Sequence, residues 1–354
     1  MRHSLLALAL LSALAACQKA EAPATPTEAT PATTAADTAE ADAKFADLSK
    51  RSLDGWLQLS PISATQIGEH KYDGEIDDLS AAGRQKGLEF SKKMLAELDA
   101  MDVTKLSREN QVDAAILRNQ LQYDIWGSET LQGWAWDPQV YSGLAGSAVY
   151  GLMAREFAPL PQRLGSAITR MEKLPALFAQ ARENLDPARV PQIHAQTAAD
   201  QNKGILSIVD TFITPNLKEL PEAERARAEK ATTALQAAVA EHQEWLDKTL
   251  VPNAKGDFRV GQTLYDQKLQ FALLSSLSRT EIKQRAEDEI KRVREEMYAV
   301  ARTVLKDKPD APEMPDSPTA EQQQKAIEAA LELAYADKPA RDKVVEAAEG
   351  ALAS

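Results

Sequence analysis

The sequence predicts an all-α protein. From Phe45 onward, apolar residues recur at steps of three and four along most of the chain, which is the period of an amphipathic helix. No run of alternating apolar and polar residues is long enough to indicate a strand, so we expect no large sheet. The 18 prolines and 15 glycines mostly lie between the periodic segments. The predicted fold is a large assembly of long amphipathic helices.

The first 43 residues predict a signal peptide (1–16) and a tether (17–43). A basic residue, a short apolar run from Leu5 to Leu14 and the ending Leu-Ala-Ala-Cys are typical of a bacterial lipoprotein signal, with Cys17 as the lipidated residue. An ordinary secretory signal with a chance cysteine is the alternative. The tether is rich in Ala, Thr and Pro and is expected to be disordered. Because Gln18 is not aspartate, we expect a lipid-anchored protein of the outer membrane that faces the periplasm.

Composition excludes two kinds of site. Cys17 is the only cysteine, so neither an intramolecular disulfide nor a cysteine zinc cluster can form. The net charge of −12 repels phosphate, and no basic stripe with interleaved aromatic residues offsets it. We therefore expect no nucleic-acid partner. The expected partners are the membrane, through the lipid anchor, and peptides.

Individual helices are predicted where apolar residues repeat with helical spacing between proline, glycine or capping residues. Pro161 and Pro221 stand where the first turn of a helix accepts proline. In chain order, the predicted segments are 45–59, 88–98, 107–125, 161–171, 205–212 and 235–250.

The stretch 256–305 predicts a helical hairpin. Gly256 and Gly261 bracket a turn, an apolar run follows, and Ser278 with Glu281 forms a capping box that starts a long helix. Charged residues occupy the remaining faces of that helix, so we expect one buried stripe. Its members are Ile282, Ala286, Ile290, Val293, Met297, Val300 and Val304.

Two stretches interrupt the helical pattern. Residues 127–151 are predicted to form a glycine-rich loop that carries Trp134, Trp136, Tyr141 and Tyr150. These aromatic residues, together with His70, are candidates for lining a substrate cleft. The alternative is a long connection that its own aromatic residues fasten to the helices. Residues 309–318 carry four prolines and are expected to be a stiff connector.

Several segments in a fixed order resemble one bacterial family, the domain of unknown function 885. They are SPISATQIGEHKYDGEIDDLS (60–80), WDPQVY (136–141), FRVGQTLYDQKLQ (258–270), REEMYAVAR (294–302) and ADKPARDKVVEAAEGALA (336–353). The resemblance implies a helical zinc metallopeptidase whose HExxH motif lies in its C-terminal part. This chain matches only the N-terminal part of the family. Zinc is accordingly expected only in the full-length members.

The residues themselves give no catalytic or metal-binding motif. Catalytic zinc usually takes three protein ligands, commonly including two histidines four apart on a helix, and no two histidines here have that spacing. Only His70 has a carboxylate candidate nearby, Asp73, whereas His242 stands on an apolar stripe and is expected to be a hydrogen-bonded core or edge residue. A G-x-S-x-G nucleophile elbow is also missing. We therefore predict no catalytic residue, metal ligand or cofactor in this chain.

The expected organisation after the tether is a helical domain (44–308), the connector (309–318) and a C-terminal helical pair (319–354). The last helix stops within its apolar pattern, which indicates an interrupted sequence. The favoured function is the N-terminal helical portion of an envelope metallopeptidase-like lipoprotein that is not catalytically competent alone. The alternatives are a non-enzymatic lipoprotein that binds peptides or a protein partner, and an enzyme with a site of another kind.

Overall fold

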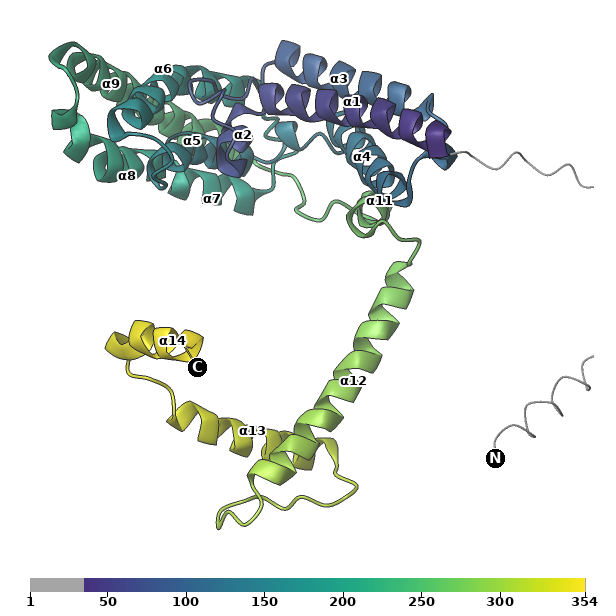
Figure 1. The fold of residues 1–354 in the computed structure, drawn as a ribbon. Coiled ribbons are helices and arrows are strands. Elements are labelled where there is room, and N and C mark those ends of the chain that lie inside the picture. Colours follow the sequence, from purple (N-terminus) through teal and green to yellow (C-terminus); the bar gives the residue numbers. More distant parts are fainter. Residues whose placement is uncertain (1–34, 354) are drawn as a thin grey trace, which may run out of the picture. The chain divides into compact units, whose positions relative to one another are not determined.

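The computed structural model describes residues 35–353, and these residues are predominantly helical, as predicted (Figure 1). Within them, β structure is limited to a single bridge between Pro191 and Gly256. The chain divides between Phe258 and Arg259 into two compact units. We call these the N-terminal unit (described residues 35–258) and the C-terminal unit (259–353). The division falls inside the range 44–308 that was expected to be one domain.

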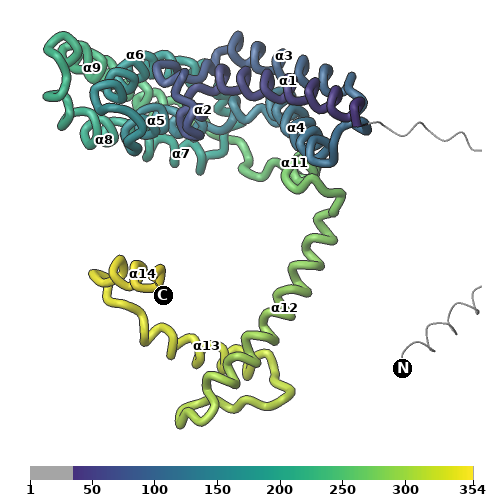
Figure 2. The backbone as a smooth tube through the Cα atoms, viewed as in Figure 1, coloured from purple at the N-terminus to yellow at the C-terminus, as the bar shows by residue number. Residues whose placement is uncertain are grey.

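The first part of the N-terminal unit is built from α1 (Ala35–Leu59), α3 (Ala81–Asp99) and α4 (Arg108–Trp126) (Figure 2). Ser80 and Ser107 cap α3 and α4, because their hydroxyl groups accept from the backbone N–H three residues on. Phe45, Leu48, Met94, Leu98, Leu106, Ala114 and Leu121 form the core between these helices. Helix α1 begins at Ala35, so the last residues of the expected tether are helical. Cys17 and the rest of the tether lie outside the described residues.

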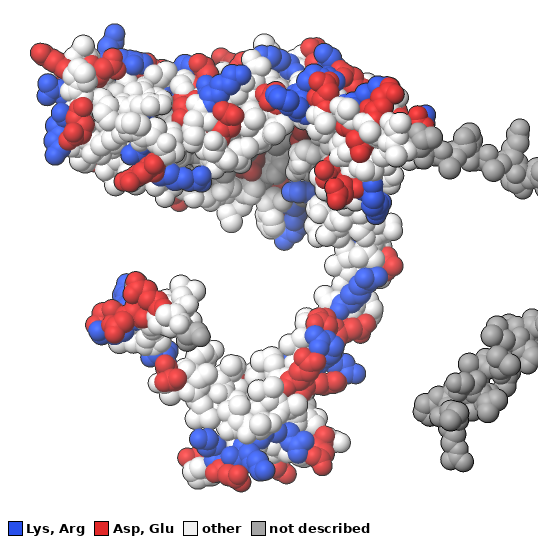
Figure 3. Space-filling view, viewed as in Figure 1, with Lys and Arg blue, Asp and Glu red and all other residues white. Residues whose placement is uncertain are grey.

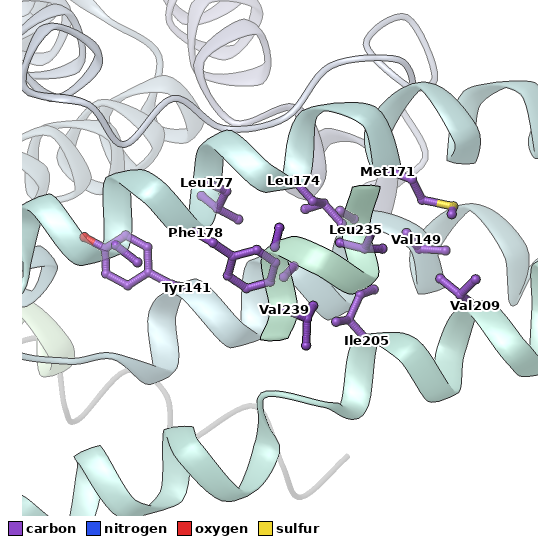
Figure 4. Packing of buried hydrophobic residues seen from close by; sticks show 14 of the residues in the cluster. Tyr141, Val149, Met171, Leu174, Leu177, Phe178, Ile205, Val209, Leu235 and Val239 are labelled. Carbon is purple, nitrogen blue, oxygen red and sulfur yellow. The ribbon is translucent and has the colours of Figure 1, made fainter. Parts of the chain in front are cut away.

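The larger core of this unit lies among α2 (Pro61–Ile67), α5 (Gln139–Met153), α6 (Leu160–Asn184), α7 (Gln192–Gln201), α8 (Gly204–Ile208) and α9 (Glu222–Trp245). Helix α6 packs on α5 and α9. Figure 4 shows Tyr141, Leu174, Phe178, Leu235 and Val239 pointing into this shared interior. Pro61 and Pro161 stand in the first turns of α2 and α6, where a missing N–H has no cost.

Short helical turns connect the longer helices. They are the 3₁₀ turns η1 (Val103–Lys105), η3 (Gly133–Ala135) and η5 (Thr214–Glu219), the π turns η2 (Gly127–Leu131), η4 (Val209–Ile213) and η6 (Leu246–Leu250), and α10 (Val251–Asn253). The prediction of a loop over 127–151 was wrong, because η2, η3 and α5 make most of this segment helical. The loop was predicted because of the glycines in this segment, but helix packing can override their low helix propensity.

Gly256, near the end of the N-terminal unit, makes a close backbone contact. Its N–H donates to Val190 O at 2.9 Å. A Cβ atom at this position would lie 2.0 Å from Arg189 O, so only glycine fits.

The C-terminal unit contains α11 (Gln262–Leu273), α12 (Arg279–Val304), α13 (Ala320–Ala336), η7 (Arg341–Lys343) and α14 (Val344–Ala353). The predicted capping box is confirmed: Glu281 N–H donates to Ser278 Oγ at 3.2 Å, and Ser278 N–H donates to Glu281 Oε2 at 2.9 Å. Helix α12 packs against α13 and not, as the predicted hairpin required, along α11. The connector 309–318 contributes to the small core through Ala311 and Met314.

The predicted buried stripe of α12 was wrong. Ile290 is 60% exposed and Val300 is 61% exposed, while the buried residues of this helix are Tyr298 and Ala301. The apolar period does identify an amphipathic helix. Within the C-terminal unit, however, α13 covers only an adjacent face, which holds Tyr298, Ala301 and Leu305.

Candidate functional site

A buried polar network is centred on Arg170 of α6, whose exposed fraction is 0%. Its guanidinium group donates to the carbonyl oxygens of Pro61 (3.0 Å), Tyr72 (3.3 Å), Glu75 (2.8 Å) and Ala148 (3.1 Å), and to Thr65 Oγ1 (2.7 Å). These acceptors belong to α2, to α5 and to the loop 68–79. Arg170 therefore fastens that loop to three helices.

The network continues from Arg170 to the surface through three side chains. Thr65 Oγ1 donates to Asp73 Oδ1 at 2.7 Å, and Asp73 Oδ2 lies 3.0 Å from His70 Nδ1. Because a carboxylate oxygen accepts, Nδ1 of His70 is assigned as the donor, and in that neutral tautomer Nε2 is the acceptor. Nε2 takes part in no hydrogen bond among residues 35–353. The imidazole ring stacks on Phe157 with centroids 3.6 Å apart, and one third of its side chain is exposed.

Burial controls the charges in this network. It lowers the pKa of Arg170 to about 10, an effect that Asp73, Asp77 and Glu75 oppose. The guanidinium group still carries its charge at neutral pH. Burial also raises the pKa of Asp77, whose Oδ2 accepts from Ile62 N–H at 3.2 Å. A buried arginine with this many acceptors holds its surroundings rigidly, since removing it would leave each acceptor unpaired.

Three of the four candidate aromatic residues gather at one place. The Tyr141 hydroxyl, on a fully buried side chain, donates to Trp134 O at 2.7 Å and accepts from Asn184 Nδ2 at 3.0 Å. The Arg84 guanidinium lies 3.9 Å from the centroid of the Trp134 ring. Trp136 Nε1 donates to Leu131 O at 2.9 Å. These contacts fasten the segment to the helices, and its role in a cleft stays a prediction.

Tyr150 and His70 are not part of that cluster. Tyr150 lies on α5, is 51% exposed and meets Phe212 edge-on at 5.7 Å. His70 belongs to the Arg170 network instead. The sequence candidates thus occupy three separate places in the N-terminal unit.

Comparison with known proteins identifies the family. The sequence profile of DUF885, described as a bacterial protein of unknown function, matches residues 61–354. The chain belongs to the DUF885 family. No curated protein matches the sequence significantly.

A solved structure of a putative lipoprotein of unknown function from Shewanella oneidensis is similar to this DUF885 chain. The two share 27% sequence identity and superpose with a TM-score of 0.72. The match covers 86% of this chain but 55% of the Shewanella chain, so this chain spans about half the length of that relative. The likeness confirms the fold and a relationship to a protein described as a putative lipoprotein.

The two other histidines of the described DUF885 chain lie in the N-terminal unit. His242 is buried in the core between Phe178 and Trp245, at centroid distances of 5.0 and 5.7 Å. It was expected to be hydrogen-bonded, but its Nδ1 has no hydrogen-bond partner among the described residues. Burial, and then Arg182, lowers its pKa to about 4. His194 Nδ1 lies 3.7 Å from Asp137 Oδ1, which is too far for a hydrogen bond.

Residues 35–353 contain no group of three His, Cys, Asp or Glu side chains that could hold a metal ion. In the same range, none of the helices combines the length and apolarity needed to cross a membrane. On the charged surface, Lys and Arg side chains lie among Asp and Glu side chains on the face of the N-terminal unit shown in Figure 3.

Sequence reasoning missed Arg170 and Thr65 and noted Asp73 only as a neighbour of His70. A signal for Arg170 was available: it stands on the apolar stripe of α6, between Ala167 and Met171. A charged residue on such a stripe is buried only where partners satisfy it.

Proposed function

We propose that this chain is the N-terminal helical part of an envelope hydrolase of the metallopeptidase type, and that His70 is its substrate-facing side chain. The resemblance to the domain of unknown function 885 implies zinc ligands in a part of the family that this chain does not match. The N-terminal part would then supply a wall of the substrate cleft rather than the metal.

The hydrogen-bonded His70 ring is the observation that carries this proposal. Asp73 is hydrogen-bonded to Nδ1, and Phe157 stacks on the imidazole ring and fixes its plane. Arg170 fixes the loop that carries His70 by donating to Tyr72 O and Glu75 O. A neutral imidazole held in this way offers Nε2 to a peptide N–H or to a proton that leaves during hydrolysis. A side chain whose position is fixed by a buried network is suited to aligning a substrate.

The test uses a chain extended by the coding sequence that follows Ser354, assayed for zinc content and for hydrolysis of a peptide library. We expect an HExxH motif in the extension, about one zinc per chain and peptide cleavage. His70→Gln should reduce cleavage by at least tenfold while zinc content and melting temperature stay unchanged. The neighbouring exposed Lys71→Gln is the matched control. An extension without a zinc motif, or full cleavage by His70→Gln, contradicts the proposal.

The same proposal places the protein at the outer membrane through lipidation at Cys17. The Shewanella relative's description as a lipoprotein supports this anchor. Stable attachment needs more than one acyl chain, which a bacterial lipoprotein carries. Cys17→Ser should move the protein from the membrane fraction to the soluble periplasmic fraction. A serine variant that stays membrane-bound would show that another anchor exists.

A second candidate function, non-enzymatic peptide binding, rests on the surface beside Trp136. The Trp136 ring lies 5.9 Å from the ring of His194 in α7. The chain neighbour of His194, Ile193, is 63% exposed, and Val140, four residues after Trp136, is 39% exposed. Peptides that bind there should change tryptophan fluorescence, and Trp136→Leu should abolish that change. Saturable binding to this chain without any cleavage by the extended chain would favour this candidate over the hydrolase.

A further inference from the structure

Helix α12 carries a long apolar stripe that the other helices of the C-terminal unit leave uncovered. The exposed fractions along it are 60% for Ile290, 36% for Val293, 38% for Met297, 61% for Val300 and 43% for Val304. With Ile282 and Ala286, the stripe extends for about 30 Å at the helical rise of 1.5 Å per residue. No charged residue separates its members on this side of the helix, because each step is three or four residues.

This stripe differs from the face of α12 that packs on α13. Ala301 is 1% exposed and lies in the small core with Tyr298, Leu305 and Ala326, whereas its neighbour Val300 is 61% exposed. Successive residues of a helix point about 100° apart, so the two faces are adjacent and separate. Within the C-terminal unit, one apolar face of α12 is therefore covered, and the next is not.

A continuous exposed apolar stripe with steps of three and four is suited to packing against another helix. Monomeric proteins rarely leave such surfaces in water, and those that do usually bind something there. The flanking charges indicate what kind of partner fits. Arg292 is paired with both Glu289 and Glu296, so this side carries both signs instead of the basic excess of a membrane-surface helix.

We infer that the stripe is the docking surface for amphipathic helices of the part of the DUF885 fold that this chain does not match. The family profile runs through the whole of α12, and the Shewanella structure covers 86% of this chain while 45% of its own length, 100 minus 55, remains unmatched. That unmatched length is the chain available in the Shewanella relative to cover the corresponding stripe. The inference concerns packing and does not depend on the hydrolase activity.

The probe for this docking is the unmatched portion of the Shewanella protein, produced together with residues 18–354 of this chain. We expect a one-to-one complex in size-exclusion chromatography with light scattering. The double variant Val293→Glu, Val300→Glu should weaken it by at least tenfold. Ala299→Glu, at an exposed position on the charged side of α12, is the matched control and should leave binding unchanged. Absence of the complex with the unchanged chain, or an equal loss in the control, overturns the inference.

A second measurement keeps folding and docking apart. In the chain alone, Val300→Glu should leave the thermal unfolding of α12 unchanged, whereas Ala301→Glu should lower its melting temperature by several degrees. Equal losses in both variants would show that the chain covers its own stripe. If sedimentation shows a homodimer that dissociates in the double variant Val293→Glu, Val300→Glu, the stripe binds a second copy of the chain instead. Vesicle binding lost in the same pair would assign it to a membrane. Each of these three results overturns the inference.

Discussion

Helices α6 and α12 have nearly the same length, 25 and 26 residues, and both are amphipathic, but they differ in what they bury. Helix α6 buries ten side chains, including Arg163 and Arg170, because α5 and α9 pack along it. Helix α12 buries only Tyr298 and Ala301, because α13 covers a single face of it. The comparison teaches that apolar periodicity identifies a face that requires a partner. It does not say whether the same chain supplies that partner.

Removing the Arg170 guanidinium should have the largest effect. Arg170→Met leaves four carbonyl groups and Thr65 without their donor and leaves Asp73 and Asp77 without the buried cation. The free energy of unfolding should fall by about 3–5 kcal/mol. Urea unfolding followed by tryptophan fluorescence measures this, because all five tryptophans lie in the N-terminal unit. Arg225→Met, at an exposed arginine of α9, should cost less than about 0.5 kcal/mol.

The same substitution in the two helices tests the comparison directly. Ile168 of α6 is fully buried and Ile290 of α12 is 60% exposed. Ile168→Ala should cost about 2–5 kcal/mol through lost burial and an unfilled cavity. Ile290→Ala should change stability by less than about 0.5 kcal/mol. Tryptophan fluorescence follows the unfolding of the N-terminal unit, and far-UV circular dichroism follows the unfolding of both units. Similar costs for the two variants would mean that the α12 stripe is buried.

His242 should make the core of the N-terminal unit sensitive to acid. Its pKa is lowered to about 4 from an ordinary 6.5. The imidazole therefore binds a proton below pH 6.5 in the unfolded chain but only below about pH 4 in the folded chain. The contribution of His242 to the free energy of unfolding is therefore complete above pH 6.5. It is lost as the pH falls toward 4, by up to about 3 kcal/mol. In urea unfolding at several pH values, His242→Phe should remove this part of the decline. His70→Gln, which leaves His242 in place, should retain it.

The capping box of α12 should give the smallest effect. Ser278→Ala removes the acceptor for Glu281 N–H and should destabilise the first turn by about 1 kcal/mol. Amide hydrogen exchange of residues 279–283 should accelerate about fivefold while the exchange of α6 is unchanged. Glu296→Gln, farther along α12, is the control. If exchange at 279–283 is unchanged in Ser278→Ala, contacts other than the cap hold this turn.

Local features were predictable from the sequence because they depend on neighbours in the chain. The capping serines Ser107 and Ser278 set the starts of α4 and α12, and Pro161 lies in the first turn of α6, as expected. The position of His70 beside Asp73 also follows from three residues of separation. The contacts of Arg170 with Pro61 O and Ala148 O could not be predicted, since they join residues distant in the sequence.

The sequence by itself determined that this protein is helical, where α4, α6 and α12 begin, and which faces of the helices are apolar, because capping and side-chain period along a helix are local. Only the tertiary structure decided which apolar faces are covered and which charged side chain is buried. Arg170 can be buried because backbone carbonyl groups from three segments meet around it, and Val300 stays exposed because α13 covers the face beside it. Burial depends on which elements meet in space, and the pattern of a single helix carries no information about its neighbour.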